Sequence, residues 1–314
     1  MMFTRSLCRN LLVAAPIAAA WLVLGAPASA QVREGSFEKT LTVAGAVDLS
    51  VQTGSGSITI QPGATGTVRV AAKLKSDGSW TASDSDIEQR IQKIIQNPPI
   101  EQQGNVIRIG RFADSDLARN ISISYEVTVP ADTKVAAKTG SGSMVIGAVK
   151  GAVEASSGSG SIKADGAASL EASTGSGSIR AASIAGAISA KSGSGSITIA
   201  QSGPGDASAS TGSGSIALTG VNGAARVNSG SGSITIDGRP AGPWSLHSSS
   251  GGITMTVPPG AAFDLDARTS SGAISSAYPV TMTGTIDKHH VSGKVGGGGP
   301  AVQVSCSSGS IRIK

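Results

Sequence analysis

The hydrophobic and polar positions of this chain follow a short motif, Gly-Ser-Gly-Ser-Ile, that recurs along most of its length. Between Met144 and Ile274 the copies return every 17 to 21 residues. The six exact and four looser copies end at Ile58, Met144, Ile162, Ile179, Ile197, Ile216, Ile234, Ile253, Ile274 and Ile311. Steps this regular indicate stacked supersecondary units, none of which can bury its own apolar face alone.

Apolar residues alternate with polar ones on both sides of the motif. They stand nine and seven positions before the last residue of a copy, at that residue, and two positions after it. In the copy that ends at Ile197 these residues are Ile188, Ala190, Ile197 and Ile199. A period of two predicts strands with one inward face, and successive repeats would pair in parallel about 4.8 Å apart. The pattern therefore predicts an all-β fold, a parallel β-solenoid of about ten turns.

The corner between the two strands of a repeat is stricter than the strands. Every copy has Ser three positions and Gly two positions before its last residue, as in Ser194 and Gly195. We expect this glycine to have a positive φ, a conformation that a Cβ would oppose. Five positions before the last residue every copy has Ser or Thr, except the last copy, which has Cys306. This column predicts a small inward slot that Cys306 also fills.

Two segments interrupt the repeat. Residues 31–64 hold the first strands and the first copy, and residues 65–130 follow as an insertion with a helix predicted over 86–96. Its apolar face consists of Ile87, Ile91, Ile94 and Ile95. We expect the insertion to cap one end of the solenoid, where an open sheet edge would invite aggregation. Residues 131–314 carry the tandem repeats, with a looped excursion predicted at 278–300.

Residues 1–30 have the pattern of a cleaved secretory signal peptide. Arg5 and Arg9 precede an apolar run, and Ala28-Ser29-Ala30 provides small residues for cleavage. We expect no transmembrane segment in the remaining chain. The formal net charge of the whole chain is only +5 and its basic residues are scattered, which argues against a nucleic-acid partner. Cys306 is the one cysteine left after cleavage, so no intrachain disulfide can form.

Few residues of this chain are candidates for a catalytic or metal-binding role. Glu154 and Glu171 share an outward column on adjacent repeats, with backbones about 5 Å apart, which is near the carboxyl separation of retaining glycosidases. A solvated pair without a catalytic role is the alternative interpretation. His289 and His290 lie in the predicted excursion, but adjacent histidines lack the spacing of a chelating site. We therefore expect no catalytic, cofactor-binding or metal-binding residues and no cofactor, while the binding of a metal by the two histidines stays open.

Several motifs carry a resemblance to a known family. The run Tyr125-Glu126-Val127-Thr128-Val129-Pro130, the tandem Ser-Gly-Ser corners, and the ending from Gly296 to Ile313 resemble the bacterial putative-adhesin family of β-strand-repeat proteins, close to its head-domain type. The resemblance covers nearly all of the chain after residue 30. It implies an exported, right-handed parallel β-solenoid with an adhesin-like role.

The sequence favours a non-enzymatic, exported module of the cell envelope that is periplasmic, secreted or associated with the cell surface. Its ligand would be a surface glycan or another envelope protein. One alternative is a polysaccharide-degrading enzyme that uses Glu154 and Glu171. A further alternative is an accessory or sensor protein of an envelope-stress system. The oligomeric state is not indicated by any pattern in the chain.

Overall fold

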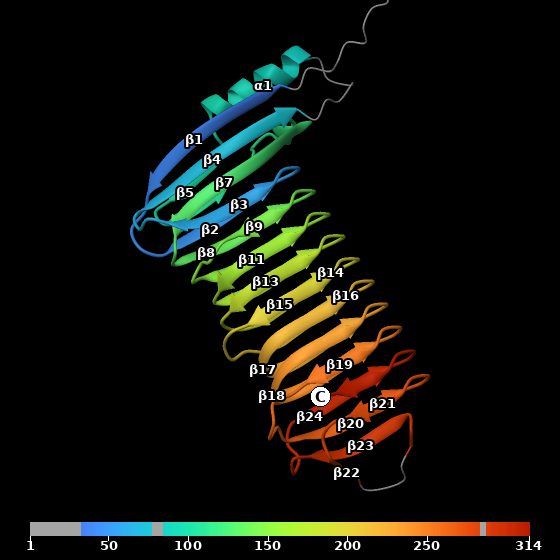
Figure 1. Ribbon diagram of the computed structural model, residues 1–314. Coiled ribbons are helices and arrows are strands. Elements are labelled where there is room, and N and C mark those ends of the chain that lie inside the picture. Colours follow the sequence, from blue (N-terminus) through green and yellow to red (C-terminus); the bar gives the residue numbers. More distant parts are fainter. Residues whose placement is uncertain (1–32, 77–83, 283–286) are drawn as a thin grey trace, which may run out of the picture. The chain divides into compact units, whose positions relative to one another are not determined.

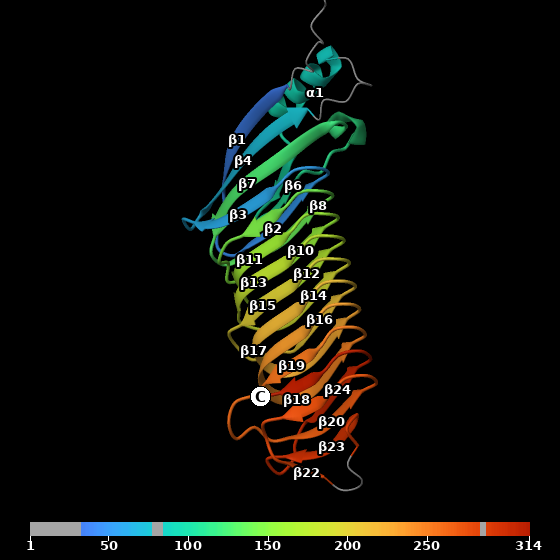
Figure 2. The same ribbon diagram turned by 45° about the vertical axis from the view of Figure 1, so that its right-hand side comes forward.

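The computed structural model describes residues 33–76, 84–282 and 287–314, of which the side chains of 84 and 85 are not described. The predicted signal peptide, residues 1–30, lies outside the described residues. Residues 32–314 form one compact unit. Its fold is all-β, and its repeats stack as consecutive coils, each made of a strand, a corner and a second strand (Figures 1 and 2).

The strands form two rows. Row A holds the strands before the corner, which are β2 (Val47–Thr53), β8 (Thr133–Thr139), β10 (Ala152–Ser157), β12 (Ser169–Thr174), β14 (Ile188–Ser192), β16 (Ala207–Thr211), β20 (Phe263–Thr269) and β24 (Ala301–Cys306). Row B holds the strands after it, which are β3 (Ile58–Gly63), β9 (Met144–Ile146), β11 (Ile162–Ala167), β13 (Ile179–Ile184), β15 (Ile197–Gln201), β19 (Ile253–Thr256), β21 (Ile274–Ser276) and β25 (Ile311–Ile313). Two long strands, β17 (Ile216–Ser229) and β18 (Ile234–Ser248), run from row B into row A.

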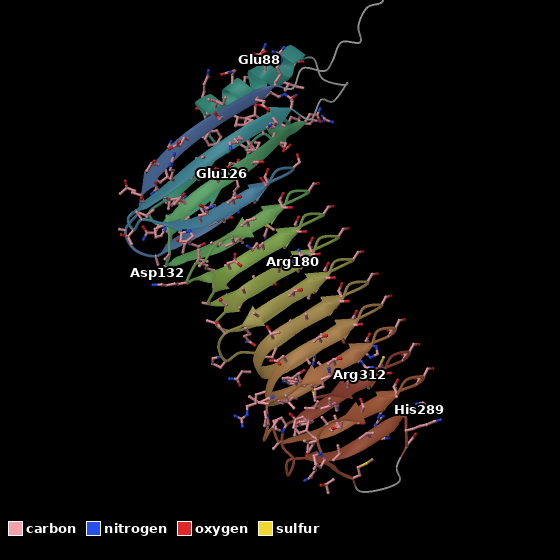
Figure 3. The ribbon with its side chains drawn as sticks, viewed as in Figure 1. Glu88, Glu126, Asp132, Arg180, His289 and Arg312 are labelled. Carbon is pink, nitrogen blue, oxygen red and sulfur yellow. The ribbon has the colours of Figure 1, made fainter. Side chains whose placement is uncertain are left out.

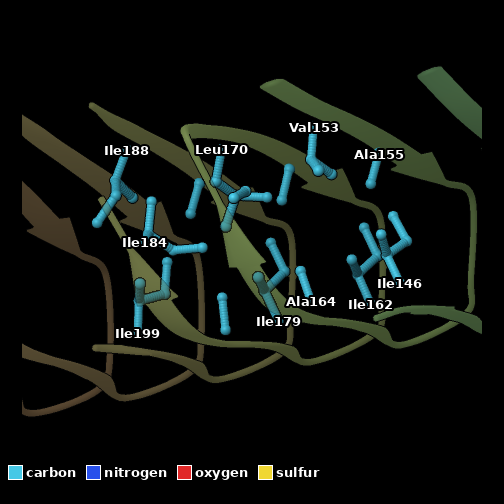
Figure 4. Packing of buried hydrophobic residues seen from close by; sticks show 14 of the residues in the cluster. Ile146, Val153, Ala155, Ile162, Ala164, Leu170, Ile179, Ile184, Ile188 and Ile199 are labelled. Atoms are coloured by element: carbon cyan, nitrogen blue, oxygen red, sulfur yellow. The ribbon is translucent and has the colours of Figure 1, made fainter. Parts of the chain in front are cut away.

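The predicted parallel register is confirmed between successive repeats as far as the copy that ends at Ile253. Equivalent residues of neighbouring coils pair in parallel, as Leu170 does with Ile188 in row A and Ile179 with Ile197 in row B. The inward residues of the two rows face each other across a thin core (Figure 4). An exception is Ser276, which occupies an inward column but is exposed because β21 pairs with a strand on one side only.

The Ser or Thr five positions before the end of each copy forms a ladder through the corners. Ser157 Oγ donates to the carbonyl of Gly142 in the preceding coil at 3.0 Å and accepts from the N–H of Gly160 in its own coil at 2.8 Å. The same two bonds are made by Thr139, Thr174, Ser192, Thr211, Ser229, Ser248 and Thr269. Cys306 makes them through Sγ, both at 3.0 Å. The buried hydroxyls therefore satisfy backbone groups that the tight corners would leave unpaired.

The expected reason for the corner glycines is wrong. No corner glycine from Gly142 to Gly309 is among the described residues with a positive φ. Instead, the coils approach one another too closely for a side chain: a Cβ on Gly195 would lie 1.9 Å from the carbonyl oxygen of Gly177. Glycine is needed here for close backbone contact between coils rather than for a left-handed conformation.

Residues 65–130 extend both rows beyond the first coil. In row B, β7 (Ile121–Pro130) pairs in parallel with β3, followed by antiparallel β4 (Thr67–Ser76) and β1 (Glu34–Thr42). In row A, β6 (Val106–Ile109) pairs with β2, and β5 (Ile100–Gln103) pairs antiparallel with β6. The segment also contains α1 (Asp84–Gln96), which begins two residues before the predicted start, and the 3-10 helix η1 (Ser115–Ala118).

The predicted apolar face of α1 packs on β1. Ile87, Ile91 and Ile94 are buried, and Ile95 is half-buried against the same core. Gly35 on β1 permits this approach, because a Cβ there would lie 2.6 Å from Cγ2 of Ile91. The helix thus covers the outermost strand of row B (Figure 1).

The far end of the stack departs from sequence order. The coil of residues 301–314 lies between two coils that precede it in the chain, because β24 pairs with both β18 and β20, and β25 pairs with both β19 and β21. The predicted excursion at 278–300 is not only a loop: β22 (Val280–Met282) and β23 (His290–Val295) lie within it. Strand β23 pairs antiparallel with the edge of β20 that would otherwise be open.

Candidate functional site

A groove of about 900 Å³ lies along the starts of the row A strands, from β8 to β24. Each coil between the two ends contributes three successive residues: the residue before the first inward position of row A, that inward residue, and the outward residue after it. The lining consists of 152–154, 169–171, 187–189, 206–208, 224–226 and 243–245, with Lys134, Ala301 and Gln303 at its ends. The groove therefore repeats with the coils, about 4.8 Å per step.

Small side chains are the reason the groove is hollow. Ala152, Ser169, Ala187 and Ala224 occupy the first of the three positions, and Ser189 and Ser208 occupy the outward position in the middle of the groove. The middle residue of each three points inward and is buried. Trp244, for example, is 1% exposed. Trp244 is a packing residue, and its Nε1 donates to the carbonyl of Gly223 at 3.0 Å.

Charged groups gather at separate points along the groove. Glu154 lies opposite Glu171 on neighbouring strands, as the repeat predicts. Nζ of Lys138 is 3.1 Å from Oε1 of Glu154. Further along, Oδ1 of Asp206 accepts from the N–H of Ala224 at 2.9 Å, and the exposed guanidinium of Arg226 follows one coil later. The groove can thus offer hydroxyl, carboxylate and guanidinium groups to a ligand that lies along the stack.

The geometry around the two glutamates suits binding better than acid catalysis. Both side chains are exposed, and the ion pair with Lys138 engages Glu154. A glycosidase holds its acid in a desolvated pocket, and sugar sites commonly stack the ring on an aromatic face. The one aromatic side chain of the groove, Trp244, is buried. The pair can therefore contact a ligand at the surface, where a cation would compete with Lys138 for Glu154.

The two adjacent histidines have separate partners. Nδ1 of His289 lies 3.1 Å from the carbonyl of Gly272, the acceptor that a hydroxyl of a further coil would otherwise use. Nε2 of His290 lies 2.9 Å from Oδ1 of Asp266, which also bonds Arg268. Figure 3 shows His289 near the corners at the far end of the stack. No group of three or more His, Cys, Asp or Glu side chains suited to a metal occurs in the described part of the chain.

The sequence pattern identified two residues of this groove without predicting a groove. It placed Glu154 and Glu171 in one outward column, but it assigned no role to Lys134 and Asp206. These two residues stand in the first of the three lining columns, immediately before the first inward position of their copies. Five of the ten copies have Ala or Ser at this position, and these small residues were the available signal. Other charged side chains, such as Arg180 and Arg312, lie on row B (Figure 3).

Within the described ranges, no helix has the length and apolar character needed to cross a bilayer.

Comparison with solved structures finds similar chains at low sequence identity. A putative adhesin from Parabacteroides distasonis is 13% identical, with 89% of this chain and 97% of that chain covered and a TM-score of 0.44. A putative adhesin from Bacteroides fragilis is 12% identical, with 89% and 97% covered and a TM-score of 0.35. A putative lipid binding protein from Parabacteroides distasonis is 9% identical, with 89% and 96% covered and a TM-score of 0.32.

No curated protein matches this chain. A family model, however, matches residues 47–314, which include all ten copies of the repeat. That model is described as Toastrack DUF4097. The chain therefore belongs to the Toastrack DUF4097 family.

Proposed function

We propose that this chain is an exported, non-enzymatic, adhesin-like module of the cell envelope that binds an extended polymer along the row A groove. The ligand class is a surface glycan or an extended segment of another envelope protein. The proposal takes the number of about ten turns from the repeat and the right-handed coil from the family resemblance, and it treats residues 65–130 as the cap of one end. Export rests on the signal-peptide pattern of residues 1–30.

The observation that carries this proposal is the continuity of the groove across successive coils. A small-molecule site is usually one concave pocket with a few convergent polar groups. Here the lining instead repeats from coil to coil, with small residues in the middle and charges spaced along it. Such a surface fits a chain-like ligand that makes similar contacts at regular steps. The corner serines and threonines are already engaged in the ladder and do not line the groove, so the polar contacts proposed here come from the outward residues of the groove.

Blocking the middle of the groove tests the proposal. The double variant Ser189→Arg, Ser208→Arg places two long side chains in the lining on paired strands. The matched control is Thr198→Arg, Ala217→Arg, which makes the same change at paired outward positions of row B. Co-sedimentation with insoluble envelope polymers, peptidoglycan and surface polysaccharide, should show binding by the wild type and the control and loss of binding by the groove variant. Equal binding by all three proteins, or none by the wild type, would overturn it.

Location can be measured separately. The expected result is that the protein is recovered outside the cytoplasm when intact and lysed cells are compared. Recovery in the cytoplasmic fraction with residues 1–30 still attached would contradict export.

The register of Glu154 and Glu171 favours a second candidate, hydrolysis of a polysaccharide. Neighbouring parallel strands are about 4.8 Å apart, which is near the separation of about 5–5.5 Å between the carboxyl groups of retaining glycosidases. Release of reducing ends from acidic and neutral glycans should be measured for the wild type, Glu154→Gln and Glu171→Gln. Activity that both substitutions abolish would replace the binding proposal with this one.

A further inference from the structure

The coil of residues 301–314, called here the inserted coil, is held from two sides. Val302 pairs with Trp244 on one side and with Leu265 on the other. In row B, Ile311 pairs with Ile253 on one side and with Ile274 on the other. The inserted coil therefore separates two coils that are consecutive in sequence, residues 244–257 and 263–277, and fills the slot between them.

The side chains of the inserted coil depend on this slot for burial. Val302, Val304 and Ile311 are at most 1% exposed, and Cys306 connects the hydrogen-bond ladder from Gly251 to its own corner. Outside the slot, these groups and both backbone edges would face water. The coil is thus stable only where two matching coils flank it.

The connection that leads into the inserted coil can change direction. It runs through four consecutive glycines before Pro300, and three of them have positive φ: 59° at Gly296, 93° at Gly297 and 92° at Gly298. Glycine reaches many backbone conformations at low cost, so this segment can serve as a hinge. Hinges of this kind permit exchange of an identical element between protomers.

We propose that two copies of this chain exchange their inserted coils, so that residues 301–314 of each copy fill the slot of the other. Every pairing of the slot is reproduced in the exchanged form, because the second copy supplies the same residues in the same register. Only the hinge changes conformation. The partner of this surface is thus a second copy of the chain, in a closed and symmetric dimer.

The exchange has a consequence for the groove. Ala301 and Gln303 of the inserted coil line one end of it. In the exchanged dimer each groove is completed by residues of the other copy, and the dimer carries two grooves. Two sites on one particle increase the overall avidity for a polymer without any new contact.

Cross-linking between differently tagged copies tests the exchange. His247 and Ser305 are paired in register across the slot, with Nδ1 and Oγ 2.9 Å apart. In a Cys8→Ser, Cys306→Ser background, one copy carries His247→Cys and the other carries Ser305→Cys. The two copies are co-expressed and treated with a short bismaleimide. If all molecules exchange, random pairing of equal amounts gives about half heterodimers, which cross-link covalently.

The matched control uses Lys191→Cys and Ser210→Cys, which are paired in the same outward column in the middle of the stack. This pair should give no more than background heterodimer. A single chain that carries both His247→Cys and Ser305→Cys shows that the coil is inserted and the site can react. Cross-linking of that chain only within itself, together with background heterodimer in the mixture, would overturn the proposal. The readout contains no polymer, so its outcome is independent of the binding experiment.

Discussion

Substitution of a corner glycine by alanine should destabilise the stack, although the backbone conformation there is not left-handed. A Cβ on Gly195 would lie 1.9 Å from the carbonyl oxygen of Gly177 and 2.4 Å from its carbon. An ordinary contact needs at least 3.4 Å, so the two coils would have to separate by roughly 1.5 Å at a hydrogen-bonded position. Gly195→Ala therefore forces a local opening of the corner.

The opening affects two buried hydrogen bonds of the ladder. Ser192 Oγ donates to the carbonyl of Gly177 at 2.9 Å, directly across the opened gap, and accepts from the N–H of Gly195 at 2.8 Å. Leaving buried polar groups unpaired costs about 1–3 kcal/mol each. The loss of glycine flexibility in the unfolded chain offsets about 0.4–1 kcal/mol of this. We expect the free energy of unfolding to fall by about 3 kcal/mol.

Guanidinium unfolding followed by far-ultraviolet circular dichroism measures this loss. Because repeat arrays can unfold in more than one step, amide hydrogen exchange near residue 195 supplies a local measurement. The control is Gly54→Ala in the first coil, where φ is not positive and a Cβ would have no neighbour within 4 Å. It should change stability by less than about 0.5 kcal/mol. The reasoning is refuted if the two substitutions have equal effects.

Three further predictions concern single buried groups. Thr174→Val removes both ladder bonds at constant shape and should lower stability by about 2 kcal/mol in thermal unfolding, since two backbone groups lose their partner. Cys306→Ser should change the melting temperature little, because a hydroxyl can make both ladder bonds of Sγ. Cys306→Ala should lower the melting temperature, because a methyl group can make neither. The hydroxyl of Tyr125 has no hydrogen-bond partner among the described residues, and burial raises its pKa. Tyr125→Phe should therefore be neutral or stabilising near pH 7. Wild-type stability should fall above about pH 10, where the unfolded phenol ionises and the folded one does not, and this fall should be smaller in Tyr125→Phe.

The period-two pattern was sufficient to predict which residues are inside. Ile188, Ala190, Ile197 and Ile199 are all at most 4% exposed, and the same columns are buried in nearly every coil. The pattern succeeds because a strand in a stacked coil has only two faces. The face toward the core accepts apolar residues, and the other face is exposed to water. The helix also followed from its own spacing, with an error of two residues at its start.

Two features could not be predicted, and both concern contacts between coils. The pattern at Gly195 does not distinguish a positive φ from a close approach of the next backbone, since both require the absence of a Cβ. The order of the last coils is hidden for a related reason. Every copy of the repeat presents the same columns, so nothing in the sequence of residues 301–314 specifies which coils they join. Sequence order was the natural expectation, and the pairing of β24 with β18 shows that it does not hold.

The hydrogen-bond ladder also gives the stack a dipole along its length. Each Oγ–H points toward the coil nearer to α1, from Thr269 at one end to Thr139 near the other. Aligned bond dipoles add, as they do along a helix, and each bond polarises the next. A further coil can therefore add to the ladder only if its own Oγ–H bond points in the same direction along the stack as those of its neighbours. Two such columns meeting head to head would bring acceptor against acceptor or donor against donor, so growth by stacking is restricted to one orientation.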